Sequence, residues 1–326
     1  MCRTVRSSDA DADADADGPA PSLPLAVVVI HHDAAECCVA TVAALRAQGL
    51  AVAVTVVDNA SSADAMAMLR DGCSDVEIIE CTANLGYGPG ANVGLRRWLA
   101  QGEGEWVAVA AHDALPAPGC LAALVAAART HPDAAFVAAE FGDGFDMVPA
   151  FDWVIGGYSR PATRGRGWVD VDYPNGTLFV ARRQALVDIG LFDERYFAYC
   201  EEVDLGLRAR ARGWRVGMVW GAVVVNGRLP SQLLADYLQV RNTLLLIRTH
   251  HGRRPAAFRS LLSIPPMFGR ARRDRHRWHV HLCLEGRALI DFWRGRFGPP
   301  PPAVVATVHN AAHRASMIRC VRTALR

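Results

Sequence analysis

Residues 25–62 read LAVVVIHHDAAECCVATVAALRAQGLAVAVTVVDNASS, and this stretch decides the fold. It holds two apolar runs rich in β-branched residues, Leu25–Ile30 and Ala51–Val57, on either side of a helix-like segment at 34–48. An unbroken apolar run of this length is typical of a strand that is buried on both faces of a parallel sheet. The stretch therefore predicts a strand, a covering helix and a second parallel strand.

The same alternation continues along the chain. The pattern predicts helices at 62–71, 89–101 and 117–131, and strands at Val76–Cys81, Trp106–Ala110 and Ala134–Ala139. Strands that alternate with helices through short loops are typical of a doubly wound, mostly parallel α/β sheet with helices on both faces.

The alternation breaks after residue 140. Residues 141–173 are rich in glycine and aromatic residues and predict loops and short strands that wall a site. Beyond them the sequence predicts a strand at Gly176–Ala181, a helix at 198–212, strands near 215–225 and a helix at 231–250.

Both ends of the chain differ from this middle part. Residues 1–23 carry an acidic Asp-Ala repeat and are expected to be disordered. We therefore predict an α/β domain at 24–250 and a helical, Arg-rich extension at 251–326. Eleven arginines face three acids between Arg253 and Arg296, with Trp278, Phe292 and Trp293 interleaved. This pattern suits contact with an anionic membrane surface, or else a solvated helix face.

Composition excludes several classes of protein. The net charge of +2 argues against a general nucleic-acid binder, and the nine cysteines form no C-x-x-C pair, which argues against a zinc ribbon or a thioredoxin site. No apolar leader and no apolar run long enough for a membrane span occur in the sequence. We expect a cytoplasmic protein with reduced thiols, attached at most to the inner face of the membrane.

Polar residues follow four successive predicted strands. They are His31-His32-Asp33, Asp58-Asn59, the loop from Asn84 to Asn92, and His112-Asp113. One such residue is ordinary helix capping. Four in a row indicate a ligand site, because open α/β sheets bind ligands beyond the carboxyl ends of their strands.

These residues also carry a family resemblance. The runs VVDNASS and NLGYGPGANVGL, a strand that ends in Asp113, the segment NGTLFVARRQALVDIGLFDERYFAYCEEVDLGLRARARGW and the later Arg241-Asn242 pair resemble family 2 glycosyltransferases, most of all the rhamnosyltransferase-like branch. The resemblance covers about residues 25–245 and implies a GT-A fold. It also implies inverting transfer of a sugar, rhamnose being one candidate, from a UDP- or dTDP-linked donor to a glycan, lipid-linked or small-molecule acceptor.

The resemblance assigns roles to single residues. Asp58 would contact the nucleotide base, with Asp33 on the same donor side, while Asn84, Gly86 and Asn92 would shape the base and ribose pocket. Asp113 matches the last acid of the D-x-D motif and would hold a divalent cation, Mn²⁺ or Mg²⁺, on the diphosphate. Glu202 matches the second acid of E-D-x-D and would be the general base.

Four positions depart from the family pattern. Ala111 stands at the first D-x-D position, Asn226 stands where a late histidine often completes the metal site, and Glu202 replaces an aspartate. His31-His32-Asp33 stands where T-Y-N is common. These departures put tight cation binding in question.

Other interpretations stay open at this point. The polar strand-end residues could be caps, and Asp204 is expected to pair with Arg208 four residues on, a structural role. His31 and His32 could be metal ligands, although histidines at strand ends are more often only hydrogen-bonded. Gly86-x-Gly88-x-x-Ala91 matches the relaxed dinucleotide fingerprint, so an NAD(P)- or S-adenosylmethionine-dependent enzyme is one alternative. A non-catalytic GT-A-like nucleotide-binding protein is another, since Ala111 and Asn226 weaken the site.

Overall fold

The computed structural model describes residues 23–155, 157–226, 232–273 and 277–311. The predicted disordered segment therefore lies outside the described residues, except for Leu23. The described strands are β1 Leu25–His31, β2 Val52–Asp58, β3 Glu77–Glu80, β4 Trp106–Ala111, β5 Ala114–Pro116, β6 Ala134–Phe141, β7 Met147–Asp152, β8 Gly157–Pro161, β9 Gly167–Asp170, β10 Leu178–Arg182 and β11 Arg215–Asn226. The described helices are α1 Ala35–Arg46, α2 Ala63–Gly72, α3 Tyr87–Gln101, α4 Cys120–Thr130, α5 Arg183–Ile189, α6 Glu201–Ala211, α7 Gln232–His251, α8 Arg253–Leu262, α9 Ile264–Arg273 and α10 Trp278–Trp293.

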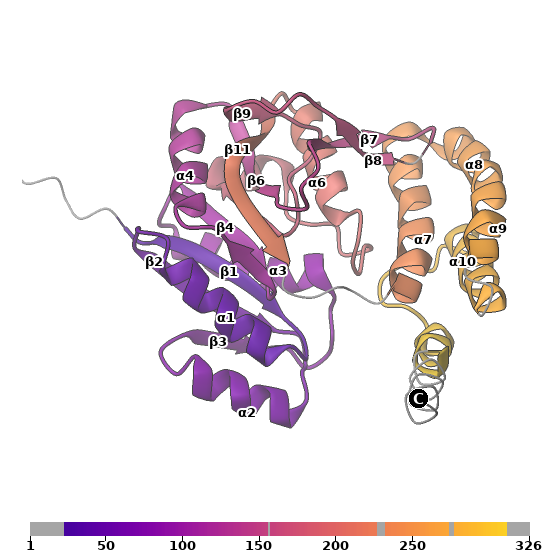
Figure 1. The fold of residues 1–326 in the computed structure, drawn as a ribbon, viewed down its shortest axis with the longest axis horizontal. Coiled ribbons are helices and arrows are strands. Elements are labelled where there is room, and N and C mark those ends of the chain that lie inside the picture. Colours follow the sequence, from indigo (N-terminus) through magenta and orange to yellow (C-terminus); the bar gives the residue numbers. More distant parts are fainter. Residues whose placement is uncertain (1–22, 156, 227–231, 274–276, 312–326) are drawn as a thin grey trace, which may run out of the picture.

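A mostly parallel sheet forms the centre of the molecule, in the order β3-β2-β1-β4-β10-β6-β11-β5 (Figure 1). The four N-terminal strands β3, β2, β1 and β4 are parallel neighbours, as predicted. The predicted fifth strand, β6, is not the next neighbour. Instead β10 lies between β4 and β6 and is antiparallel to both.

Alternate residues of the central strands serve two different cores. Val27 and Val29 of β1 pack into the core beneath α1, α2 and α4, whereas Val28 and Ile30 pack into the core beneath α3, α5 and α6. Both faces of the strand are apolar because both are covered by helices, which explains the unbroken apolar runs.

The C-terminal part is helical, as predicted. Helix α7 packs against α8 and α10, and α9 joins α8 to α10. Figure 1 shows α8, α9 and α10 on the side of α7 that faces away from the sheet. No helix of the described ranges combines the length and the apolar character needed to cross a bilayer.

Candidate active site

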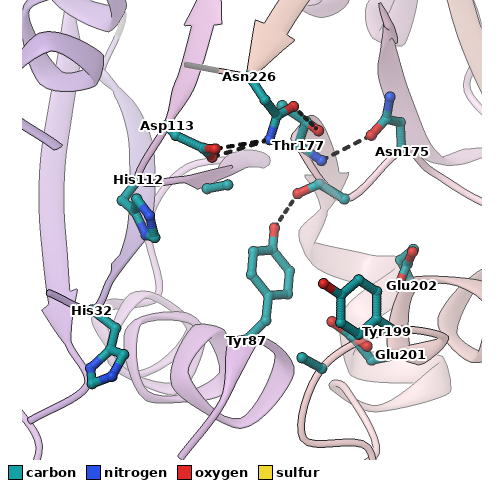
Figure 2. A pocket seen from close by; sticks show the side chains of 13 residues that line it. His32, Tyr87, His112, Asp113, Asn175, Thr177, Tyr199, Glu201, Glu202 and Asn226 are labelled. Carbon is teal, nitrogen blue, oxygen red and sulfur yellow. Dashed lines mark hydrogen bonds between the residues drawn. The ribbon is translucent and has the colours of Figure 1, made fainter. Parts of the chain in front are cut away.

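An open pocket of about 470 Å³ lies beyond the carboxyl ends of β1 and β4. Figure 2 shows Asp113, His112 and His32 on one side of it and Glu201, Glu202 and Tyr199 on the other. The remaining lining residues close the pocket between these walls: Tyr87, Ala111, Asn175, Gly176, Thr177, Ala198 and Asn226. The structure thus brings two of the predicted site residues, Asp113 and Glu202, to the same pocket.

Asp113 lies in the two-residue link between β4 and β5 and is held by Asn226 at the end of β11. The Asn226 amide nitrogen donates to both Asp113 carboxylate oxygens, at 3.1 and 3.2 Å, and Thr177 Oγ1 donates to the Asn226 amide oxygen at 3.0 Å (Figure 2). The residue that replaces the expected histidine therefore still contacts the acid of the D-x-D position.

The charge of the pocket favours a cation. Its described lining holds three carboxyl groups, at Asp113, Glu201 and Glu202, and neither arginine nor lysine. A nucleoside diphosphate would meet this negative surface with only His32 and His112 as ionisable bases. A hard divalent cation accepts carboxylate and amide oxygens and completes its shell with substrate phosphates. Asp113 and Asn226 fit such a cation, if it displaces the hydrogen bonds between them.

Glu202 is the second residue of helix α6, which follows a strained turn. The two residues before the helix, Tyr199 and Cys200, have left-handed φ angles of 70° and 74°, which non-glycine residues seldom adopt. Asn242 of α7 holds this turn, since its amide nitrogen donates to the carbonyls of Ala198 and Tyr199 at 2.9 Å each. Strain of this kind persists only where neighbouring contacts fix it, and it is common at active sites.

Burial changes the acidity of the two glutamates. It raises the pKa of Glu202 to about 7. Burial, together with the charge of Glu202, raises the pKa of Glu201 well above its usual range. Two adjacent carboxylates cannot both ionise easily in such a place, so one proton stays on the pair at neutral pH. Glu201 is the more deeply buried of the two, which favours its protonated form.

Asp58 lies in a network just outside the pocket lining. Its Oδ1 accepts from His31 Nδ1 at 2.8 Å and from the Ser61 hydroxyl at 2.5 Å, and its Oδ2 accepts from the Ser61 backbone N–H at 3.1 Å. The Ala34 backbone N–H donates to His31 Nε2 at 3.2 Å, which puts the imidazole proton on Nδ1. Asp33 is tied to the same loop, accepting from the Ser62 N–H at 2.8 Å.

Gly86 and Asn92 join the loop after β3 and the start of α3 to the segment that leads to Glu202. Gly86 has φ of 90°, and a Cβ there would lie 1.9 Å from the Phe197 carbonyl oxygen, so only glycine fits. Asn84 accepts from the Gly86 N–H at 2.9 Å. The buried Asn92 exchanges hydrogen bonds of 2.9 and 3.0 Å with the backbone of Phe192. None of Asn84, Gly86 and Asn92 lines the pocket, although Tyr87, the residue after Gly86, does.

Donor contact by Asp33, Asp58, Asn84, Gly86 and Asn92 therefore stays a prediction. The sequence did not single out Tyr87, whose hydroxyl donates to the Gly176 carbonyl, nor Asn175 and Thr177 (Figure 2). Their sequence signal was the Asn-Gly-Thr turn before β10. The predicted pair of Asp204 and Arg208 is confirmed, at 2.8 Å, and His250 also binds Asp204.

A second pocket of about 480 Å³ adjoins the first. It shares Glu202, Thr177 and Asn226 with the first pocket and continues along the β7–β8 hairpin past Met147, Pro149 and Tyr158. Glu202 thus lies where the two pockets meet, a suitable position for a base that acts on one ligand while a second ligand occupies the other pocket.

A separate cluster of ionisable residues lies between α7 and α10. Asp236, His281 and Glu285 are buried, and their ligand atoms lie within 4.8 Å of one another. His281 Nδ1 is 3.2 Å from Asp236 Oδ2. None of the three lines the pocket that holds Asp113, so this cluster does not supply ligands to a cation there.

Known proteins resemble this chain in sequence and in fold. The family model for "Glycosyltransferase like family 2" matches residues 21–260. An N-acetylglucosaminyl-diphospho-decaprenol L-rhamnosyltransferase of Mycobacterium tuberculosis is 28% identical over an alignment of 240 positions, and the match covers 62% of this chain and 76% of the relative.

Two solved structures share the fold. The mannosyltransferase PcManGT from Pyrobaculum calidifontis, in complex with GDP-Man and Mn²⁺, has a TM-score of 0.54 and 17% identity, over 94% of this chain and 82% of that one. GalNAc-T7 with UDP, GalNAc and Mn²⁺ has a TM-score of 0.56 and 14% identity, over 69% of this chain and 48% of that one.

Proposed function

Because this chain belongs to the glycosyltransferase-like family 2 and is therefore a glycosyltransferase that uses a nucleotide sugar, we propose that it inverts the configuration of the transferred sugar with Glu202 as general base. The observation that carries this proposal is the position of Glu202. It lies at the junction of two pockets, opposite Asp113, and burial holds its pKa near neutrality, at about 7.

The first pocket is assigned to the donor. Asp113 and Asn226 would hold a divalent cation, which when bound neutralises charge on the departing diphosphate. Mn²⁺ in the two related structures supports a cation of this kind. Asp58, fixed by His31 and Ser61, remains our candidate for the base-binding side, with Asp33, Asn84, Gly86 and Asn92 shaping that end.

The second pocket is assigned to the acceptor. An acceptor hydroxyl there gives its proton to the Glu202 carboxylate while its oxygen bonds to the anomeric carbon. The bond from that carbon to the diphosphate oxygen breaks on the opposite face, which inverts the configuration. Because proton transfer needs a base whose pKa is near the working pH, the raised pKa of Glu202 suits this role.

The substrate classes follow from the relatives. The Mycobacterium tuberculosis relative is named as a rhamnosyltransferase that acts with a diphospho-decaprenol compound. We propose a UDP- or dTDP-linked donor, rhamnose first among the sugars to try, and a glycan or lipid-linked acceptor. The extension beyond residue 250 is proposed as a separate functional part that contacts the membrane. Both the family match and the relatives favour this function over an NAD(P)- or S-adenosylmethionine-dependent enzyme.

The test is a transfer assay with a panel of nucleotide sugars and membrane extracts as the acceptor source. We expect one donor to give a product. The anomeric configuration of its new linkage, read by NMR, should be opposite to that of the sugar in the donor. Glu202→Gln should lower the rate at which this product forms by at least about a hundredfold. A product with retained configuration would contradict the proposed role of Glu202.

A further inference from the structure

Helices α8 and α9 expose a row of large apolar side chains. Phe258, Leu261 and Leu262 follow the three- and four-residue spacing that places side chains on one side of α8, and Leu261 is 66% exposed. Ile264 and Phe268 continue the exposure on α9. Exposed apolar side chains are ordinary when scattered, whereas a contiguous group of them marks an interaction surface.

The turn of the β7–β8 hairpin lies beside this row. Arg259 of α8 donates from Nη2 to the carbonyl oxygen of Ile155 at 3.2 Å. Val154 and Ile155 on the turn are exposed, Ile155 by 73%. Trp153 stacks on His251 at the end of α7, with ring centroids 5.4 Å apart. These contacts fix the hairpin turn next to α8 and add two apolar side chains. We call the α8–α9 row together with Val154 and Ile155 the apolar face.

The charge around the apolar face has one sign. Residues 252–273 contain six arginines and no acidic residue. Arg253, Arg254 and Arg272 are exposed. Aromatic and aliphatic side chains bordered by arginine are the composition of protein surfaces that adsorb to anionic lipid, because the apolar groups enter the interface while the cations stay at the headgroups. A protein partner would need a matching acidic and apolar surface, whereas a bilayer offers both everywhere.

The same hairpin leads from the apolar face to the second pocket. Met147, Pro149 and Tyr158 line that pocket, and the turn lies about six residues from Pro149, a reach of roughly 20 Å along a strand. The Tyr158 hydroxyl also lies 3.1 Å from Sγ of Cys200, a residue of the turn that precedes α6 and Glu202. A headgroup held at the apolar face would therefore have a short path to the proposed base.

We propose that the apolar face docks on an anionic membrane surface and that the second pocket takes its acceptor from that membrane, as a sugar-bearing headgroup on a lipid carrier. The acceptor assignment rests on the proposed function, whereas the docking does not. The docking surface that we propose is α8, α9 and the β7–β8 turn, the part of the Arg-rich extension that adjoins the hairpin of the second pocket. On α10, Phe292 is buried, whereas Trp278 and Trp293 are exposed.

The test is flotation of the full chain with vesicles of phosphatidylcholine alone or of phosphatidylcholine and phosphatidylglycerol in equal parts. The wild-type chain should float only with the anionic vesicles. The variant Leu261→Ser/Ile264→Ser/Phe268→Ser should lower the floated fraction by about tenfold, because it removes three apolar groups from the contact. Arg253→Glu/Arg254→Glu should weaken binding to the anionic vesicles, as an increase in salt concentration should in the wild type.

The matched control is Met68→Ser/Val187→Ser, which changes exposed apolar residues of α2 and α5 and should float like the wild type. Failure of the wild type to float, or equal flotation of the triple variant, would overturn the docking. The docking would also be overturned if the wild type is a dimer in solution, the triple variant is a monomer, and neither binds vesicles. The apolar face would then join two copies of the chain.

Two further readings separate the docking from the proposed function. Thermal stabilisation by nucleoside diphosphates should be the same in the triple variant and the wild type. Transfer of labelled sugar into the organic-solvent extract of membranes should fall about tenfold in the triple variant, in step with flotation. Flotation without any nucleotide binding would sink the proposed function and leave the docking standing. Nucleotide binding without flotation would overturn the docking and leave the proposed function standing.

Discussion

The amide nitrogen of Asn226 lies 3.1 and 3.2 Å from the two carboxylate oxygens of Asp113. A residue at the end of β11 therefore occupies the oxygens through which Asp113 would bind a cation. Thr177 fixes the other end of the amide. Any cation must displace this contact, so we expect weak cation binding in the absence of donor and stronger binding together with the diphosphate.

Replacing Asn226 by histidine should strengthen the binding of the cation at Asp113. An imidazole binds first-row divalent cations well and, unlike the amide N–H, does not hold both Asp113 oxygens. We expect the Mn²⁺ concentration for half-maximal transfer to fall by about tenfold. Asn226→Ala removes the amide without adding a ligand and serves as control. Equal Mn²⁺ dependence in the two variants would contradict a cation site at Asp113.

Glu202→Gln should lower kcat by about two to four orders of magnitude, because a positioned general base contributes that much. In the wild type the rate should rise with pH and level off above about 7, since the pKa of Glu202 is raised to about 7 and the carboxylate is the active form. Glu201→Gln is the matched control. Because burial favours the protonated form of Glu201, this variant should retain most of the activity and the same pH profile. A larger loss in Glu201→Gln than in Glu202→Gln would reverse the assignment.

The same pKa shift predicts a cost in stability. The folded chain holds the Glu202 proton more tightly than the unfolded chain, whose carboxyl titrates near its usual value of 4.5. The free energy of unfolding should therefore fall as the pH rises from about 4.5 to about 7 and stay lower above that. Glu202→Gln cannot ionise, so its Tm relative to wild type should increase between about pH 5 and about pH 8. A difference in Tm that is constant over this range would show that burial does not oppose ionisation of Glu202.

Asn242 is expected to be a positioning residue for Glu202. Its two hydrogen bonds hold the turn in which Tyr199 and Cys200 have positive φ angles. Asn242→Ala should let this turn relax, and a small displacement of the base should lower kcat by about tenfold to a hundredfold with little change in donor KM. The exposed Gln239 on the same helix provides the control, Gln239→Ala. A loss of stability alone, with unchanged kcat, would make Asn242 merely structural.

Much of the fold could be predicted because it depends on local pattern. The runs at Leu25–Ile30 and Ala51–Val57 indicated strands buried on both faces, and β1 and β2 are parallel neighbours between two helical layers. The insertion of β10 between β4 and β6 could not be predicted, because nothing in the sequence of Leu178–Arg182 says which distant strands it will join. The short elements β5 and α5 were also missed, since three and seven residues give too little periodicity.

The candidate site divides in the same way. Asp113 and Glu202 could be identified from motif and order, and both line the pocket. His31 and Asp58 are separated by 27 positions in the sequence, and Asp113 and Asn226 by 113 positions. Only the fold brings the members of each pair together. Tyr87 and Thr177 were missed because a tyrosine after a glycine and a threonine before a strand are ordinary in loops.

The most direct test of the central claim is thermal unfolding of the full chain with UDP, dTDP, GDP and NAD, each with Mn²⁺ or with a chelator. A ligand at 100 times its Kd stabilises the folded state by about 2.7 kcal/mol, an easily measured shift in Tm. We predict that UDP or dTDP raises the Tm in the presence of Mn²⁺, less so with the chelator, and that Asp113→Asn removes the difference. Stabilisation by NAD, or by none of the nucleoside diphosphates, would contradict a nucleotide-sugar site between Asp113 and Glu202.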